Sequence, residues 1–213
     1  MPGEFSSKRA ILFDLDGTLV DSSPLHAAAF VASLQPRHAA LARAFDYSRH
    51  QGRPTAEVFR SLGVSDEEIA GLTRGKQERY RAAVAAGEVA CFPGVPDLLA
   101  RLHAAGRRLY VVTGASRRST DQVLAGTGLA RFFSGLITAE DTPRGKPAPD
   151  PYQQVVNRHG LRPADCLAVE DAANGIASAR AAGLDAVLVN TDVHVPGIPN
   201  AGPVGRLAAW LLP

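Results

Sequence analysis

The chain has 213 residues, of which 46% are hydrophobic and 21% are charged, and its formal net charge at pH 7 is +2. These proportions are ordinary for a soluble globular chain with a sizeable core, and they exclude a strongly basic protein that binds nucleic acid through its charge. No apolar stretch approaches the roughly 20 residues needed to span a membrane, so we expect neither a nucleic-acid nor a membrane partner.

The chain contains 2 cysteines, Cys91 and Cys166, whose separation matches no metal-binding pattern. So low a cysteine count indicates a reducing compartment. Residues 1–8 are polar and lack the apolar stretch of a secretory signal. We therefore expect a cytoplasmic protein, and the apolar residues around Cys166 indicate that this side chain is buried.

The first predicted strand runs from Arg9 to Asp14 and is followed by a second acid, Asp16. Parallel strands end where ligands bind, so both carboxylates should lie at the mouth of a crevice. Carboxylates this close repel each other unless a cation or a division of roles relieves the repulsion. The pair favours a metal, with one Asp as nucleophile and the other as acid and base, although a helix N-cap acid followed by a turn Asp would give the same letters.

Residues 22–88 are predicted to form an all-helical insertion. Apolar residues recur at helical spacing, as at Leu25, Ala28, Ala29 and Ala32, and no strand longer than a few residues is expected there. Because two connections join the insertion to the rest of the chain, it could close over the strand ends as a lid. A rigid second subdomain without a gating role would have the same pattern.

From Phe92 onward, predicted strands and helices alternate. The strands are expected at 108–113, 135–138, 165–170 and 186–189, and the helices at 95–105, 119–126, 150–159 and 174–182. Such alternation is typical of a doubly wound parallel sheet. The expected fold class is α/β, with a core formed by residues 1–21 and 92–213 and an α-helical cap domain formed by residues 22–91.

Further polar groups follow the later strands. Thr113 ends the second strand, Glu170 and Asp171 end a later one, and Lys146 lies on a loop stiffened by neighbouring prolines. A cation, a hydroxyl and several carboxylates at one edge of a sheet are what phosphoryl transfer requires. A metal and Lys146 would neutralise the phosphate oxygens, Thr113 and backbone N–H groups would hydrogen-bond them, and an Asp would attack.

Four short segments carry a family resemblance: Asp14-Leu-Asp16-Gly-Thr18-Leu-Val20, Val112-Thr-Gly114, Gly145-Lys-Pro-Ala-Pro-Asp150 and Val169-Glu-Asp-Ala-Ala-Asn-Gly-Ile176. In this order they resemble the four signature motifs of the haloacid dehalogenase superfamily, and the match runs from the first strand to about Gly183. The resemblance implies a Rossmann-like core, bound Mg2+ and an aspartyl-phosphate intermediate.

The resemblance also implies roles for individual residues. Asp14 would be the nucleophile, and Asp16 would protonate the leaving oxygen, then activate water, with its backbone carbonyl on the metal. Thr113, Gly114 and Ala115 would hold the phosphoryl group.

Three further residues complete the implied site. Lys146 would screen the charge of the nucleophile from that of the phosphate. Asp171 would complete the metal site, with Glu170 as a direct ligand or as a partner of the ligands. Oxygen ligands of this kind suit Mg2+.

The second Asp discriminates within the superfamily. Dehalogenases lack an acid at the position of Asp16, because a halide leaving group needs no proton, and transport ATPases have threonine there. Asp16 therefore favours a phosphatase or a phosphomutase.

The helical insertion resembles the small cap of the β-phosphoglucomutase-like and sugar-phosphatase group. His26, Arg53 and Lys76 fall where that group places residues facing the substrate, although Arg53 and Lys76 could equally be solvated helix charges. In the mutases, an arginine three residues after the cap glycine, here Gly52, grips a second phosphate. This chain has Thr55 at that position, which counts against a bisphosphate-cycling mutase.

We therefore expect a monomeric, Mg2+-dependent phosphatase that acts on small sugar or polyol phosphates. The alternative is a hexose phosphomutase of the β type. A phospho-acceptor signalling domain is a third possibility, but such a domain needs neither a large helical insertion nor an acid at Asp16.

Overall fold

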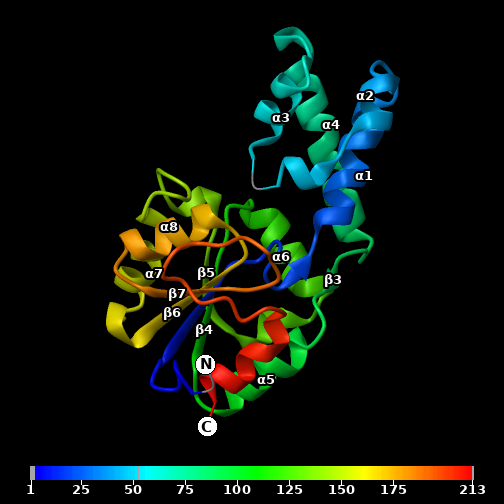
Figure 1. Ribbon diagram of the computed structural model, residues 1–213. Helices are drawn as coiled ribbons and strands as arrows, with labels where there is room; N and C mark the ends of the chain where they lie inside the picture. The colour runs from blue at the N-terminus through cyan, green and yellow to red at the C-terminus, as the bar shows by residue number, and fades with distance from the viewer. Residues whose placement is uncertain (1–2, 52, 213) are drawn as a thin grey trace. The chain divides into compact units, whose positions relative to one another are not determined.

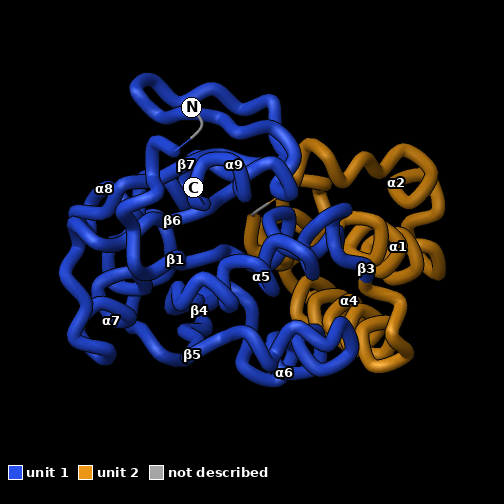
Figure 2. The backbone as a smooth tube through the Cα atoms, turned by 90° about the horizontal axis from the view of Figure 1, so that it is seen from below, with its two compact units in different colours: residues 1–21, 90–213 blue, residues 22–89 orange. Residues whose placement is uncertain are grey.

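The computed structural model describes residues 3–51 and 53–212. These fall into two compact units, Met1–Asp21 with Ala90–Pro213 (unit 1) and Ser22–Val89 (unit 2), which Figure 2 shows in separate colours. The sequence predicts the second boundary after Cys91, two residues later than the structure divides the chain. The difference arises because Ala90–Cys91 forms a strand that pairs inside unit 1.

A parallel sheet of five strands forms the centre of unit 1 (Figure 1). Its strands, in spatial order, are β5 (Phe133–Ile137), β4 (Arg108–Val112), β1 (Ala10–Phe13), β6 (Cys166–Glu170) and β7 (Asp185–Leu188). The central strand β1 pairs with β4 on one side and with β6 on the other, and all four of its residues are fully buried. The predicted α/β fold with a parallel sheet is confirmed.

Helices cover the sheet of unit 1 on both faces. They are α5 (Val95–Ala104), α6 (Arg117–Gly126), α7 (Asp150–Arg158), α8 (Ala173–Ala181) and α9 (Ala208–Leu211). On one face Leu12 and Ala168 of the strands share a core with Tyr152 of α7 and Ile176 of α8. Cys166 is fully buried in the same core, as predicted.

A short antiparallel ribbon forms where the chain leaves unit 1 and where it returns to it. Strand β2 (Val20–Asp21) pairs with β3 (Ala90–Cys91). The sequence does not predict this ribbon, because two-residue strands are too short to show an alternating pattern and their partners lie far apart along the chain.

Unit 2 is helical, as predicted for the insertion. Its helices are α1 (Ser23–Leu34), α2 (Ala39–Ala44), α3 (Thr55–Ser61) and α4 (Asp66–Ala85). They enclose a core around Phe30, Leu34, Val58 and Phe59. The sequence does not single out α2, in which only Ala42 is buried. Within the described residues, no helix combines the length and the apolar character needed to cross a membrane.

Single 3-10 turns complete the described elements: η1 (Tyr47–Arg49), η2 (Leu129–Phe132), η3 (Ala139–Asp141), η4 (Pro163–Asp165) and η5 (Val204–Leu207). Residues 195–203 are irregular chain that leads into η5 and α9. Two of these segments, η3 and the chain that enters η5, contact loops of the candidate active site.

Candidate active site

A buried lysine and a buried aspartate meet at the carboxyl end of the sheet. Asp14 follows β1 directly and is 8% exposed. The Lys146 ammonium donates to Asp14 Oδ1 at 2.6 Å and to the Val112 carbonyl at 2.8 Å, and it lies 2.5 Å from Glu170 Oε1. Lys146 comes from the loop before α7, in which its peptide bond to Pro147 is cis. This single ammonium therefore bridges the acid that follows β1 and the acid that ends β6.

Three carboxylates gather around this lysine. Oxygens of Asp14, Glu170 and Asp171 lie within 4.8 Å of one another. Glu170 also accepts a hydrogen bond from the Tyr152 hydroxyl of α7, and it packs so closely on the backbone of Gly175 that a Cβ there would collide with its carboxylate. The site thus holds more acids than its single lysine can neutralise.

Burial changes the protonation of these groups. It raises the pKa of Asp14 to about 8 even though Lys146 opposes the shift, and it raises the pKa of Asp171 to about 7. The pKa of Glu170 is also raised by burial. Burial alone would lower the pKa of Lys146, but the carboxylates of Asp14 and Glu170 hold it above its usual value. The lysine stays charged, and a bound cation would favour ionisation of the three acids.

The donor set fits Mg2+. When all three acids are ionised, they and the one ammonium leave two negative charges uncompensated, which a divalent cation would balance, and carboxylate oxygens are the hard ligands that Mg2+ prefers. Among the described residues, Asp16 is not part of this carboxylate cluster. Its charge nevertheless contributes to the raised pKa values of Asp14 and Asp171, which places Asp16 within electrostatic reach of both.

The loop after β1 is tightly packed against the cluster. Gly17 has a φ of +85°, and a Cβ at this position would clash with the Asp171 carboxylate. Its N–H donates to the Val20 carbonyl at 2.9 Å, which closes the turn that carries Asp16. Thr18 is fully buried, and its Oγ1 has no hydrogen-bond partner within the described part of the chain. Any displacement of Gly17 would therefore disturb Asp171 and Asp16 together.

The predicted phosphate-binding residues form the loop between β4 and α6. Thr113 is 4% exposed, and its Oγ1 accepts the Ala115 N–H at 3.0 Å. Its hydroxyl hydrogen is therefore available to donate elsewhere. Gly114 lies between these two residues, and Ser116 ends the loop as the N-cap of α6, where its side chain accepts from the Ser119 N–H.

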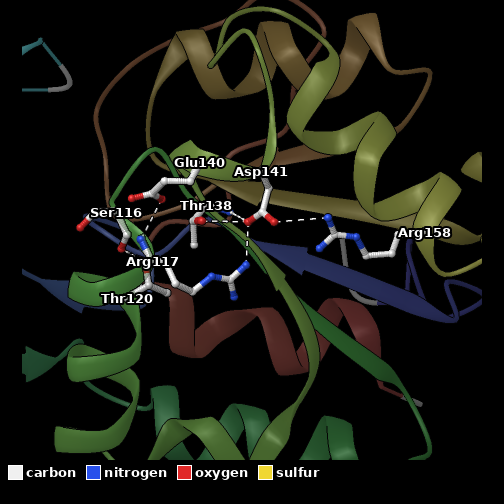
Figure 3. Close-up of polar contacts among 7 residues, drawn as sticks. All are labelled: Ser116, Arg117, Thr120, Thr138, Glu140, Asp141 and Arg158. Atoms are coloured by element: carbon white, nitrogen blue, oxygen red, sulfur yellow. Dashed lines mark hydrogen bonds and ion pairs between the residues drawn. The ribbon is translucent and has the colours of Figure 1, made fainter.

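A charged network anchors the start of α6 to η3 (Figure 3). The Arg117 backbone N–H donates to Glu140 Oε2 at 2.9 Å, and its guanidinium donates to Asp141 Oδ2 at 2.7 Å. Asp141 also accepts from Thr138 Oγ1 at 2.8 Å and from Arg158 at 3.3 Å. Arg117 is the first residue of α6 and its side chain is 41% exposed, as the sequence predicts for a solvent-facing helix residue, and its contacts also fix the end of the phosphate-binding loop.

Two of the predicted cap residues meet inside unit 2. The Lys76 ammonium lies 2.6 Å from His26 Nδ1 and 4.9 Å from the centre of the Phe30 ring. The His26 ring stacks on Tyr80 at 4.0 Å. Burial and the charge of Lys76 lower the pKa of His26 to about 3, so the imidazole is neutral and accepts from the lysine. Lys76 is only 4% exposed, which does not fit a solvated helix charge.

Arg53 is not part of this group. It is exposed, and its Nη1 lies 3.4 Å from His50 Nδ1. Gly52, the neighbouring position in the predicted cap pattern, lies outside the described residues, and Thr55 is the first residue of α3.

Sequence reasoning missed two residues that contact the candidate site. Tyr152 binds Glu170. The only feature of the sequence that points to this role is an aromatic residue just after the lysine motif, on the inward face of the helix. Asn190, two residues after β7, binds the loop that carries Asp16. An asparagine after a strand resembles an ordinary turn residue, so its partners could not be inferred.

Comparison with known proteins gives consistent matches over most of the chain. A model of the family described as haloacid dehalogenase-like hydrolase matches residues 8–183. Protein CbbY of Rhodobacter capsulatus is 34% identical over 216 residues, covering 96% of this chain and 92% of that protein. The phosphoglycolate phosphatase of Escherichia coli (strain K12) is 32% identical over 206 residues, covering 86% of this chain and 82% of the enzyme.

Solved structures agree with these matches. The crystal structure of CbbY from Rhodobacter sphaeroides in complex with phosphate has a TM-score of 0.77 and 28% identity, covering 94% of this chain and 96% of that one. A mutant of the same protein in complex with xylulose-(1,5)bisphosphate has a TM-score of 0.76 and 28% identity, and the match covers 96% of this chain and 100% of the mutant chain. Since the family model spans most of the chain and includes all four predicted motifs, the chain belongs to the haloacid dehalogenase-like hydrolase family and is, as predicted, an enzyme.

Proposed function

We propose that this protein is a Mg2+-dependent phosphatase that hydrolyses small phosphorylated metabolites, of the sugar or polyol phosphate class, through an aspartyl-phosphate intermediate. The observation that carries the proposal is the Lys146 ammonium, which donates to the buried Asp14 carboxylate inside a cluster of three acids. The similarity to a phosphoglycolate phosphatase and to a CbbY protein with bound phosphate supports it.

The proposed chemistry uses four side chains of unit 1. Asp14 attacks the phosphorus atom, and the bond between phosphorus and the leaving oxygen breaks. Asp16 gives its proton to that leaving oxygen. In the second step Asp16 takes a proton from the water that attacks the phosphorylated Asp14, so that inorganic phosphate leaves and both aspartates return to their starting states.

The remaining groups hold the phosphoryl oxygens. Thr113 can donate its hydroxyl hydrogen, because its oxygen lone pair already accepts the Ala115 N–H. Lys146 offsets the repulsion between the attacking Asp14 carboxylate and the phosphate. These interactions gain strength from burial, since little water screens them.

Mg2+ would be held by Asp14 and Asp171, together with the Asp16 carbonyl that the family resemblance implies. When bound, it supplies positive charge against the charge of the transferring group. Glu170 Oε1 already bonds Lys146 and Tyr152, and Oε2 packs against the backbone of Gly175. We therefore assign Glu170 mainly to positioning Lys146.

Removal of the metal tests this assignment. EDTA should stop phosphate release, and added Mg2+ should restore it, because the excess charge of the buried acids otherwise opposes the approach of an anionic substrate. Mg2+ should also raise the Tm of the wild type, since it binds only the folded site, and should raise the Tm of Asp171→Asn much less. Hydrolysis that continues unchanged in EDTA would refute the metal assignment.

The substrate class is tested by phosphate release from a panel of sugar and polyol phosphates, phosphoglycolate and xylulose 1,5-bisphosphate, with Asp14→Asn as the blank. We expect release from monophosphates of small polar alcohols. Glucose 6-phosphate formation from β-glucose 1-phosphate should be measured alongside. Isomerisation faster than phosphate release would favour the alternative, a β-type phosphomutase. We expect the opposite, because Thr55 stands where the mutases have their phosphate-binding arginine.

We also propose a monomeric, cytoplasmic protein. The two free cysteines, one buried and one half-buried, fit a reducing compartment. Size-exclusion chromatography with light scattering tests the monomer, and a dimer mass would overturn it.

A further inference from the structure

We propose that Asn190 is a positioning residue for the proton-transfer step, because it holds the loop that carries Asp16. The inference rests on the proposed function, in which Asp16 is the acid and base. Asn190 Nδ2 donates to the Gly17 carbonyl at 3.0 Å and to the Thr18 carbonyl at 2.9 Å. One side-chain amide thus binds both carbonyls that follow the acid.

The other end of the same side chain is also held. Asn190 Oδ1 accepts the Val204 N–H at 2.8 Å, and the Asn190 backbone N–H donates to the Gly202 carbonyl at 2.8 Å. The amide therefore uses both of its donor hydrogens and its acceptor oxygen. It connects the chain entering η5 to the loop after β1, and the loop cannot shift without breaking bonds at both ends.

The backbone of Asn190 is unusual in a way that supports this role. Its φ is +54°, and within 3–51 and 53–212 it is the one non-glycine residue with positive φ. Glycine adopts this conformation without steric cost, while asparagine is among the few other residues that tolerate it. A position that needed only the turn would accept glycine. The amide supplies what glycine lacks, namely the bonds to the Asp16 loop.

The sheet topology explains why this residue can reach the site. Strand β7 is separated from β1 by β6, so Asn190 extends past the end of β6 to reach the loop after β1. The loop contacts both this amide and the Asp171 carboxylate, against which Gly17 packs with no room for a Cβ. Gly17 is thus held by two contacts, and Asp16 is its immediate neighbour.

Two variants separate the amide from the turn. Asn190→Gly keeps the positive φ and removes all three side-chain bonds. Asn190→Asp keeps the shape and the acceptor for Val204, but it turns a carboxylate oxygen toward the Gly17 and Thr18 carbonyls, where no donor remains. Asn200→Ala is the matched control, because Asn200 also braces this segment, through the Thr191 carbonyl and the Gly202 N–H, without touching the Asp16 loop.

The decisive readout is the dependence of kcat/KM on the leaving group. An alkyl phosphate needs a proton from Asp16, whereas 4-nitrophenyl phosphate releases an anion that needs little protonation. Displacement of Asp16 should therefore lower kcat/KM about tenfold or more for the alkyl ester in both Asn190 variants and much less for the nitrophenyl ester. Asn200→Ala should leave the ratio of the two kcat/KM values at its wild-type level, even where the Tm falls.

Equal losses for both esters, or a change in Tm alone, would overturn the positioning role. So would a failure of both Asn190 variants to fold while Asn200→Ala folds, since Asn190 would then serve stability. A wild type that hydrolyses neither ester would instead refute the proposed function. A wild type that is active, with an unchanged ester ratio in the Asn190 variants, leaves the proposed function intact and rejects only this inference.

Discussion

Asp14→Asn is expected to abolish turnover, with a loss of about 10⁴-fold or more in kcat. An amide oxygen is a poor nucleophile and cannot form the proposed aspartyl phosphate. Asp14 also accepts the Lys146 hydrogen bond, and an amide oxygen can still accept it, so the site should stay assembled. Phosphate release at saturating substrate is the measurement, with a thermal melt to show that the variant is folded. Activity near the wild-type level would contradict the mechanism.

Asp16→Asn is the control that separates attack from proton transfer. This variant keeps the nucleophile, so it should still form phospho-Asp14 slowly, although its overall turnover should fall by about 10²-fold or more. Intact-mass spectrometry after incubation with substrate should detect the covalent phosphoryl group in Asp16→Asn and not in Asp14→Asn. Absence of the adduct in both variants, despite phosphate release by the wild type, would argue for direct attack by water.

Lys146→Met is expected to abolish activity and to destabilise the protein by about 3–5 kcal/mol at pH 8, because it leaves the carboxylates of Asp14 and Glu170 buried without their cation. Methionine fills a similar volume, so packing should change little. Phosphate release and denaturant unfolding, the latter without Mg2+, measure the two effects.

The loss of stability should depend on pH. Without Lys146 the pKa values of Asp14 and Glu170 in the folded protein rise further above their values in the unfolded chain. The free energy of unfolding is therefore fully retained below the unfolded-chain pKa values, near pH 4, and it falls as the pH rises through the folded-state pKa values. For Asp14 the folded value is already about 8 in the wild type. Both proteins therefore lose the Asp14 contribution alike up to about pH 8, and the difference from wild type should widen as the pH rises above that value. A difference independent of pH would point to lost packing instead.

Lys8→Met is the matched control for this prediction. Lys8 is also a nearly buried lysine, 7% exposed, which bonds the carboxylate of Asp185, the first residue of β7, and the Ala164 carbonyl just before β6. It lies at the opposite end of the strands from Asp14. Its removal should cost stability while leaving kcat close to the wild-type value.

Those parts of the fold and site that rest on local patterns could be predicted from the sequence. The strand before Asp14 is a run of apolar residues, and the positions of Thr113 and Glu170 follow from the rule that parallel strands end at one edge. Because Asp14 and Glu170 meet at this edge of the sheet, the single ammonium of Lys146 can bond both of them. The long helices of unit 2 were predictable for a similar reason, since their apolar spacing repeats over several turns.

Contacts that depend on pairing between distant and short segments could not be predicted. The β2–β3 ribbon has two residues on each side, which is too few for a periodic signal. Asn190 comes from a segment whose residues are typical of an ordinary turn, and Tyr152 comes from one whose residues are typical of an ordinary helix face. The pairing of His26 with Lys76 requires α1 and α4 to pack side by side, and neither residue alone indicates which partner it meets.

The central position of β1 has a consequence for how activity arises during folding. Ala10 aligns with Arg108 on one side and with Cys166 on the other, so the nucleophile reaches its lysine and its fellow acids only after segments roughly 100 and 150 residues apart have paired. Contacts of such long range form slowly compared with the local turns of α1 and α4. We therefore expect helical content to return early when the unfolded chain is diluted into buffer, and hydrolytic competence to return later, once β4 and β6 have paired with β1.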